Sequence, residues 1–232
     1  MKKKIFVVAL VVCILAISIA SATIAYFTDT ESAKNTFTSG NVDIKLFETN
    51  DAGTEVEITA SANQLEFANK YPGESFAKKP TIQNVANDAA YVAGIITLGS
   101  GAEADITGLL ADDDAVKAFL TGGALNATSG YATEIVRDTT ANTITIYIIA
   151  TDEVAKDGKV VLFENVKIPA KWDSAEMAKF AKLTITVKAY AVQTTGFEAD
   201  TANGLTAAEV AMKAAFGGGT DATNSDFANY FN

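Results

Sequence analysis

The segment Lys182–Gln193, with the sequence KLTITVKAYAVQ, contains the clearest structural pattern in the chain. Side chains of a β-strand point alternately to its two faces, so alternation of apolar and polar residues is typical of a half-buried strand. One predicted face contains Leu183, Ile185, Val187, Ala189 and Ala191. The opposite face contains Lys182, Thr184, Thr186 and Lys188. The segment therefore predicts a strand with one face against a hydrophobic core and the other toward solvent.

Similar short segments recur along the chain between residues that favour turns. Strands are predicted at residues 42–47 (VDIKLF), 55–59 (EVEIT), 90–98 (AYVAGIITL), 142–150 (NTITIYIIA) and 159–169 (KVVLFENVKIP). The Pro-Gly pair in YPGESF, residues 71–76, predicts a surface turn. Together these segments predict a mainly β fold, an antiparallel sandwich with short helical insertions. The predicted core includes Ile44, Ile95, Ile146, Ile148, Ile185 and Val187.

Two segments have helical rather than strand periodicity. Asp113–Leu120 begins with acidic residues, which favour the start of a helix, and glycine follows it. Thr206–Phe216 begins with a residue suited to cap a helix and precedes Gly217, which favours its end. The polar, glycine-rich residues after Phe216 predict a mobile C-terminal tail.

The first residues of the chain resemble a secretory leader. A basic start, MKKK, precedes an apolar run and a region of small residues that ends at Ala25. Cleavage is predicted between Ala25 and Tyr26, and cleavage after Ala22 is the alternative. A second alternative is an uncleaved anchor, because the apolar run through Phe27 is long enough to span a bilayer. We refer to the chain after cleavage as the processed chain.

Composition excludes several kinds of chemistry. The 232 residues contain no histidine, which excludes a histidine-based triad or an imidazole general base. The single cysteine, Cys13, lies in the leader, so the processed chain has no thiol for a disulfide or a metal site. Loss of the three leader lysines changes the net charge from -10 to about -13, and Arg137 is the single arginine. This acidity argues against a nucleic-acid partner, and no catalytic residue, metal ligand or cofactor is predicted.

Two weaker site candidates remain. The acidic run Asp112–Asp114 contains the oxygen ligands that calcium prefers, but carboxylates at a helix start favour the helix dipole, and we prefer that interpretation. Tyr131 and Trp172 lie in predicted loops and are candidates for stacking on a sugar, but for Trp172 the preferred interpretation is a half-buried loop aromatic. A carbohydrate-binding or adhesive sandwich is therefore an alternative function, and a secreted hydrolase that uses paired carboxylates is a further one.

Three blocks of sequence resemble the TasA and camelysin family of exported bacterial proteins. The first, AYFTDTESAKNTFTSGNVDIKL at residues 25–46, combines an aromatic pair, a Thr/Asp-rich stretch and a strand. The second is KYPGESFAKKPTIQNVANDAAYV at residues 70–92, and the third is LTITVKAYAVQTTGF at residues 183–197. No counterpart to this family is found for residues 99–140 or after Phe197.

The resemblance implies a jelly-roll protein that is exported with a SipW-type signal peptidase. It also implies assembly with itself, head to tail, into fibres of the extracellular biofilm matrix or the bacterial cell surface, with an accessory matrix or anchoring protein as a further partner. Family members donate an N-terminal strand to the next subunit. Some are described as metalloproteases, but a chain without histidine lacks the zinc ligands for that activity.

The residues themselves are compatible with strand donation. An open sheet edge presents unpaired backbone groups, and an extended segment from another chain can pair with them. The expected polymerisation strand consists of Tyr26, Phe27, Thr28, Asp29, Thr30 and Glu31. The alternative is that Tyr26 and Phe27 pack on their own domain. The expected organisation is a signal peptide at 1–25, an extended donor segment at 26–40, a sandwich domain at 41–197, and a C-terminal helix and tail at 198–232.

Overall fold

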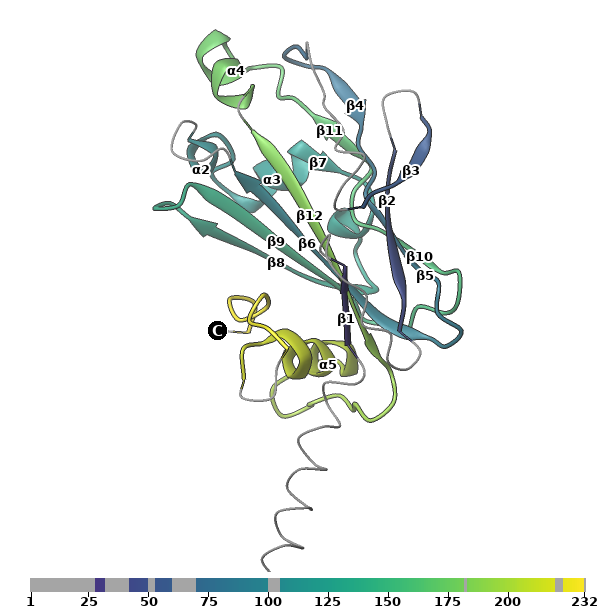
Figure 1. The fold of residues 1–232 in the computed structure, drawn as a ribbon. Coiled ribbons are helices and arrows are strands. Elements are labelled where there is room, and N and C mark those ends of the chain that lie inside the picture. Colours follow the sequence, from purple (N-terminus) through teal and green to yellow (C-terminus); the bar gives the residue numbers. More distant parts are fainter. Residues whose placement is uncertain are drawn as a thin grey trace, which may run out of the picture.

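The computed structural model describes residues 28–31, 42–49, 53–59, 70–99, 105–181, 183–219 and 223–231. These residues form three antiparallel sheets with short helices (Figure 1), and the mainly β prediction is confirmed. The strands are β1 (Thr28–Glu31), β2 (Ile44–Thr49), β3 (Glu55–Glu57), β4 (Ser75–Ala77), β5 (Thr81–Asn84), β6 (Ala90–Gly99), β7 (Leu120–Thr121), β8 (Tyr131–Asp138), β9 (Thr143–Ala150), β10 (Lys159–Val161), β11 (Asn165–Lys167) and β12 (Thr184–Gln193). The helices are α2 (Ile106–Leu109), α3 (Asp113–Phe119), the 3-10 helix η2 (Ala124–Asn126), α4 (Ser174–Phe180) and α5 (Ala207–Phe216).

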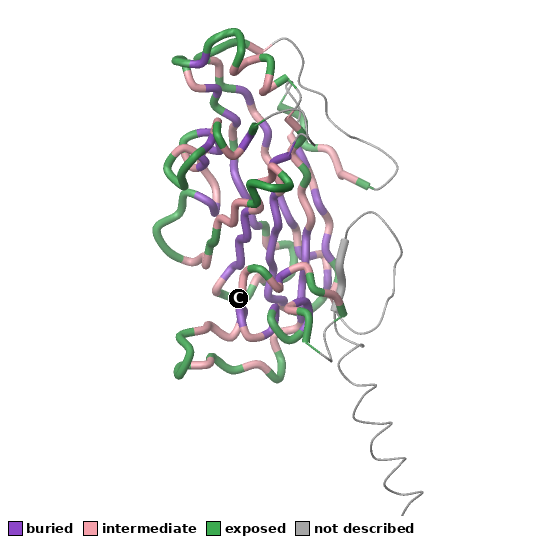
Figure 2. The backbone as a smooth tube through the Cα atoms, turned by 90° about the vertical axis from the view of Figure 1, so that its left-hand side faces the viewer, coloured by how far each residue is buried: buried purple, intermediate pink, exposed green. Residues whose placement is uncertain are grey.

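The sheets form two layers around the main core. One layer is a five-stranded sheet with the order β1-β12-β6-β9-β8. A four-stranded sheet, β10-β5-β2-β3, and a three-stranded sheet, β4-β11-β7, form the other layer. Residues from all three sheets meet in one hydrophobic cluster, in which Ile44, Ile146 and Ile148 are fully buried as predicted. Figure 2 shows the buried residues concentrated along these central strands.

The inner face of β12 follows the predicted alternation. Ala189 and Ala191 are fully buried in the main core, and Ile185 and Val187 are half-buried against it. The outer face of β12 changes along the strand: Thr184 and Thr186 are exposed and Lys188 is half-buried, whereas Tyr190 and Val192 are buried. The solvent-facing prediction therefore holds only for the first part of β12.

A third layer covers that outer face. Helix α5 and residues 223–231 pack on β12, β6 and β9 and enclose a second hydrophobic cluster (Figure 1). Ile95, a predicted core residue, lies in this second cluster rather than in the main core. The prediction of a mobile tail is wrong for residues 223–231, because Phe227 is fully buried and anchors them against the sheet.

Both predicted helices are present. Helix α3 is capped by Asp112, whose carboxylate accepts a hydrogen bond from the Ala115 N–H. Helix α5 begins with a capping box between Thr206 and Glu209 and ends at Gly217. Such caps satisfy backbone N–H groups that lack a partner within the helix.

The predicted strand at residues 159–169 is divided in two. Strand β10 pairs with β5, whereas β11 pairs with β4 and β7 in a different sheet. Gly123 lies against the connection between them with φ +62°, and a Cβ there would stand 2.8 Å from the Phe163 Cα atom. The backbone at Gly123 thus packs closely against the point where the chain leaves one sheet and enters another. Alternation of apolar and polar residues does not predict such a change of sheet.

Candidate functional site

The N-terminal strand β1 occupies one edge of the five-stranded sheet (Figure 1). Four of the six residues predicted as a polymerisation strand, Thr28–Glu31, form it. Tyr26 and Phe27, the predicted cleavage site between Ala25 and Tyr26, and the leader at 1–25 lie outside the described residues. The short length of β1 means that few backbone hydrogen bonds hold it.

Strand β1 pairs antiparallel with β12 of the same chain. The register places Thr28 opposite Val192, Asp29 opposite Ala191, Thr30 opposite Tyr190 and Glu31 opposite Ala189. In the sheet order, β12 is the one neighbour of β1. An isolated chain therefore fills the edge of β12 with its own N-terminal strand.

Strand β12 is packed on both faces where β1 joins it. The inward residues Ala189 and Ala191 are fully buried in the main core. The outward residues Tyr190 and Val192 are 0% and 1% exposed beneath the third layer. Packing on both faces holds the backbone of β12 in place. The N–H and C=O groups along the edge of β12 are therefore positioned to pair with a short strand such as β1.

A tyrosine–carboxylate contact holds the third layer on β12. The Tyr190 hydroxyl donates to the Asp226 carboxylate at 2.7 Å, and the Lys188 ammonium lies 3.4 Å from the same group. The Tyr190 ring meets Phe216 and Phe227 at centroid distances of 5.0 and 5.1 Å. Burial raises the pKa of the Tyr190 phenol, and the hydrogen bond and negative charge of Asp226 raise it further.

A second such contact joins the helix to the C-terminal segment. The Tyr230 hydroxyl donates to the Glu209 carboxylate at 2.5 Å, and Glu209 also forms the capping box with Thr206. Burial raises the pKa of the Tyr230 phenol, as does its hydrogen bond to Glu209. The third layer is thus fixed by apolar burial and by two oriented hydrogen bonds.

The acidic run Asp112–Asp114 acts at the start of α3. Asp112 caps the helix, and the Asp113 carboxylate accepts a hydrogen bond from Arg137 Nη1 at 2.6 Å. The Arg137 Nε also donates to the Leu110 carbonyl at 3.3 Å, so the single arginine ties the α2–α3 region to β8. Among the described residues, no group of three or more histidine, cysteine or acidic side chains is placed to hold a metal ion.

The two aromatic candidates for sugar stacking differ in exposure. Trp172 is 4% exposed and packs between Phe119 and Phe180, with ring centroids 6.0 and 5.9 Å away. A buried ring offers no face to a sugar, so the stacking alternative for Trp172 is wrong, and the burial favours the preferred interpretation of a packed aromatic. Tyr131 is half-buried and lines a shallow cavity of about 310 Å³ together with Asp152, Glu153 and Lys159.

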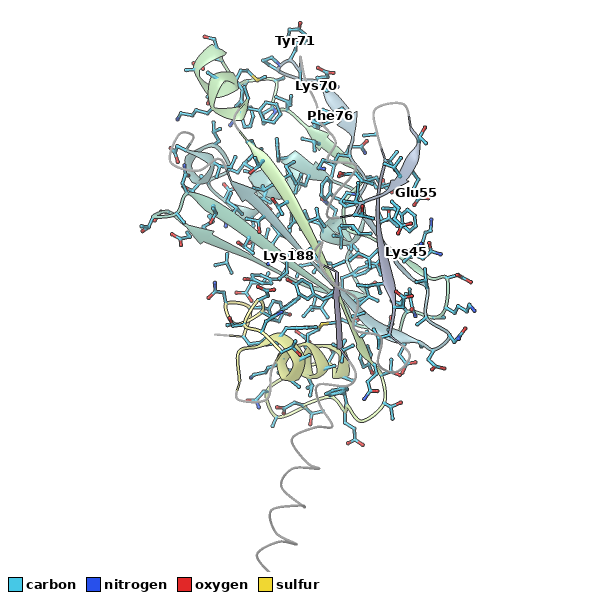
Figure 3. All side chains as sticks on the ribbon, in the orientation of Figure 1. Lys45, Glu55, Lys70, Tyr71, Phe76 and Lys188 are labelled. Carbon is cyan, nitrogen blue, oxygen red and sulfur yellow. The ribbon has the colours of Figure 1, made fainter. Side chains whose placement is uncertain are left out.

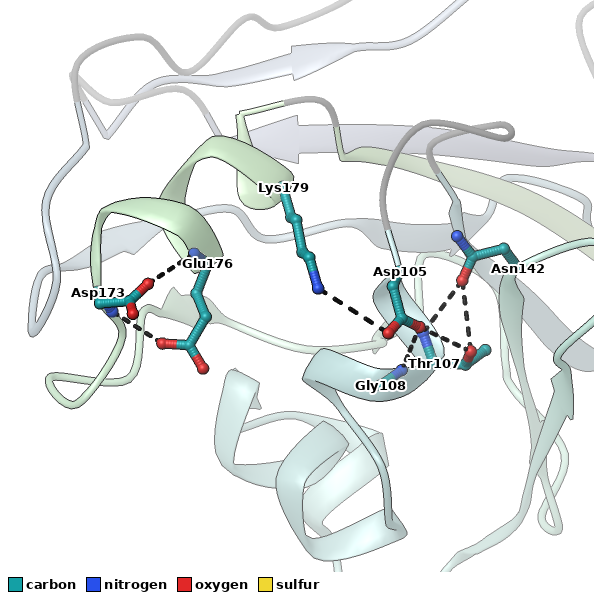
Figure 4. A network of polar contacts seen from close by, with 7 residues as sticks. All are labelled: Asp105, Thr107, Gly108, Asn142, Asp173, Glu176 and Lys179. Carbon is teal, nitrogen blue, oxygen red and sulfur yellow. Dashed lines mark hydrogen bonds and ion pairs between the residues drawn. The ribbon is translucent and has the colours of Figure 1, made fainter.

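A polar network connects α2, α4 and the β8–β9 turn (Figure 4). The Asp105 carboxylate caps α2 by accepting from the Gly108 N–H at 2.8 Å, and Lys179 of α4 lies 3.9 Å from it. The Thr107 N–H donates to the Asn142 side chain at the β8–β9 turn. These contacts join three separate elements, and helix capping and an ion pair account for them.

Comparison with known proteins gave no family model, no curated protein and no solved structure that matches this chain. None of the helices within the described ranges is both long and apolar enough to cross a membrane. The candidate site therefore rests on the geometry of β1 and β12.

Proposed function

We propose that the processed chain is a structural subunit of bacterial extracellular fibres, in the biofilm matrix or on the cell surface. Residues Tyr26–Glu31 of one subunit pair with β12 of the next. The observation that supports this proposal is the position of β1, a terminal strand of four residues at the edge of the sheet. The resemblance to the TasA and camelysin family supports it independently, and it adds a jelly-roll topology, a SipW-type signal peptidase and an accessory protein to the proposal.

The energetics permit β1 to leave its own chain. Four residue pairs join β1 to β12, and each backbone hydrogen bond contributes about 1 kcal/mol net. Ordering each residue of the segment costs about 1–2 kcal/mol. These terms nearly cancel, so the strand is held weakly within one chain, and the same ladder forms equally well between two chains.

Added contacts then favour the assembled state. If Tyr26 and Phe27 enter the neighbouring subunit, their burial contributes about 1.5–3 kcal/mol each. Each subunit gives one strand and receives one, so the contact repeats head to tail and extends into a filament. The proposal thus assigns the two aromatic residues at the start of the processed chain to a contact with the neighbouring subunit.

A removable crosslink tests the exchange of β1. Thr28 and Val192 lie directly opposite each other, at a spacing that a disulfide can bridge in an antiparallel pair. The Thr28→Cys/Val192→Cys variant of the processed chain contains no other thiol. After oxidation of the monomer we expect no fibres in negative-stain microscopy, and after reduction we expect fibres of normal width.

Two controls accompany this experiment. The single Thr28→Cys variant excludes an effect of the substitution, and it should form fibres under oxidising and reducing conditions alike. Deletion of Tyr26–Glu31 should leave a folded monomer that does not polymerise. An oxidised double variant that forms fibres as fast as the single variant, or a deleted protein that forms normal fibres, would contradict strand exchange.

A further inference from the structure

The end of the molecule opposite α5 presents a rigid, exposed aromatic residue (Figure 3). Tyr71 is 69% exposed, and it is the one large hydrophobic side chain that is exposed among the residues described. Its carbonyl accepts from the Glu74 N–H at 3.1 Å, and its own N–H donates to the Glu74 carboxylate at 2.9 Å. Gly73 has φ +83° and donates to the Ile168 carbonyl at 3.1 Å. Tyrosine is enriched among the residues that contribute most to binding at protein interfaces, and a turn that is already ordered loses little conformational entropy on binding.

Lysines surround this turn. We define the distal lobe as residues 70–80 and 165–181, which contain six lysines and three carboxylates in a chain with a net charge of -10. Lys167 and Lys171 are exposed, and neither forms an ion pair within the described part of the chain. The lobe is one surface, because Lys167 pairs across the strands with Ser75 of β4. The lysines of the lobe are Lys70, Lys78, Lys79, Lys167, Lys171 and Lys179. Lys78 is buried in an ion pair with Glu48, and Lys70 and Lys179 face Glu74 and Asp105, so the surface charge of the lobe comes mainly from Lys79, Lys167 and Lys171.

The opposite end of the sandwich is acidic. It consists of Asp43 and the loops 84–90, 151–158 and 194–206, and we call it the acidic end. It contains seven carboxylates and one lysine, Lys156. These segments lie together because Asn84 at the end of β5 donates to the Val154 carbonyl, and Ala90 pairs with Gln193 at the end of β12. The carboxylates are Asp43, Asp88, Asp152, Glu153, Asp157, Glu198 and Asp200.

The direction of β1 determines which ends meet in a filament. Along β12, Thr28 lies toward the acidic end and Glu31 toward the distal lobe. Strand β2 starts at the acidic end, since Ile44 pairs with Asn84. A donated β1 therefore leaves the acceptor toward its distal lobe and continues into the acidic end of the donor. Twelve residues, 32–43, connect the two strands, and twelve residues span at most about 43 Å.

We infer that the distal lobe, with Tyr71 at its tip, is a docking surface for the acidic end of a second copy of this chain. The inference rests on the proposed strand exchange, which brings these two surfaces together, and on their opposite charges. Complementary charges orient the partners and raise the rate of encounter at low ionic strength. Tyr71 then supplies the apolar contact that holds the two ends together after encounter.

Paired substitutions test this inference. Lys171→Glu in the distal lobe and Lys156→Glu at the acidic end each change the net charge by the same amount, and both side chains are exposed. In about 50 mM salt we expect Lys171→Glu to slow fibre elongation, followed by light scattering, about tenfold. We expect Lys156→Glu to leave it unchanged or faster, and Tyr71→Ala to slow it about tenfold at low and high salt alike.

The outcomes separate this inference from the proposed function. Equal slowing by Lys171→Glu and Lys156→Glu would mean general repulsion between acidic subunits and would overturn the docking surface. Wild-type elongation by Tyr71→Ala would overturn it as well. Neither of these two results would affect the proposed strand exchange, provided that the chain without Tyr26–Glu31 fails to polymerise. Normal fibres from the chain without Tyr26–Glu31 would instead refute the proposed function itself.

Discussion

Substitution of Phe227 by alanine measures how firmly the third layer is attached to the sheet. Phe227 is fully buried, and its ring lies 5.1 Å from the Tyr190 ring and 5.5 Å from the Tyr147 ring. Deletion of a buried phenylalanine ring costs about 3–5 kcal/mol, because transfer energy is lost and a cavity remains. A domain of this kind is stable by about 5–15 kcal/mol in total. We therefore expect Phe227→Ala to remove a large fraction of the free energy of unfolding.

Equilibrium unfolding in urea gives this free energy directly. Trp172 is the single tryptophan and is 4% exposed, so its fluorescence reports unfolding of the sandwich far from the substitution. With a slope of about 2 kcal/mol per molar urea, a loss of about 4 kcal/mol lowers the midpoint by about 2 M. The matched control is Phe231→Ala in the same segment, whose half-buried side chain should cost about 1 kcal/mol. Equal, small losses for both variants would refute the docking of residues 223–231.

Three further predictions concern the sandwich. Val187→Asp should cost about 2 kcal/mol or more, since it places a carboxylate against the main core; a melting temperature near that of the wild type would mean that this face of β12 contacts solvent. The ion pair between Lys78 and Glu48 is largely buried, so Lys78→Met alone should cost about 3–5 kcal/mol, whereas the Lys78→Met/Glu48→Leu double variant should recover most of it in the same urea assay. The raised pKa of Tyr190 means that the folded state keeps the phenol neutral. The contribution of this phenol to the free energy of unfolding is therefore complete below about pH 10, and it is lost at higher pH, where the phenol ionises in the unfolded chain. Tyr190→Phe should therefore reduce the fall in stability between about pH 9 and 11, and an unchanged pH dependence would contradict this.

The strands with clear alternation were predictable from the sequence. Residues 142–150 and 182–193 have apolar side chains at every second position, and both form long strands of the central sheet. The helices at Asp113 and Thr206 were predictable because caps and glycine stops are local signals. Helix α4 was missed although Asp173 and Glu176 form a capping box, a spacing visible in the sequence.

Long-range features had no local signal. The burial of Phe227 depends on a docking site built by β12, β6 and β9, and glycine-rich residues before it favoured a mobile tail. Strand β8 was missed because it lies at the sheet edge, where mixed exposure hides the alternation. Likewise, the sequence indicated that Thr28–Glu31 would form a strand, but the identity of its partner, β12, follows from the topology of the whole sheet.

Crosslinking between two single-cysteine variants tests strand exchange most directly. Thr28→Cys and Val192→Cys chains are mixed as monomers, assembled into fibres and then oxidised, and the products are separated on a non-reducing gel and identified by mass spectrometry. Strand exchange predicts a covalent dimer that contains one chain of each variant, joined by a disulfide between the two substituted positions, because β1 of one subunit lies on β12 of the next. Fibres that yield no such mixed dimer, while the Thr28→Cys/Val192→Cys double variant within them crosslinks only inside single chains, would contradict the account.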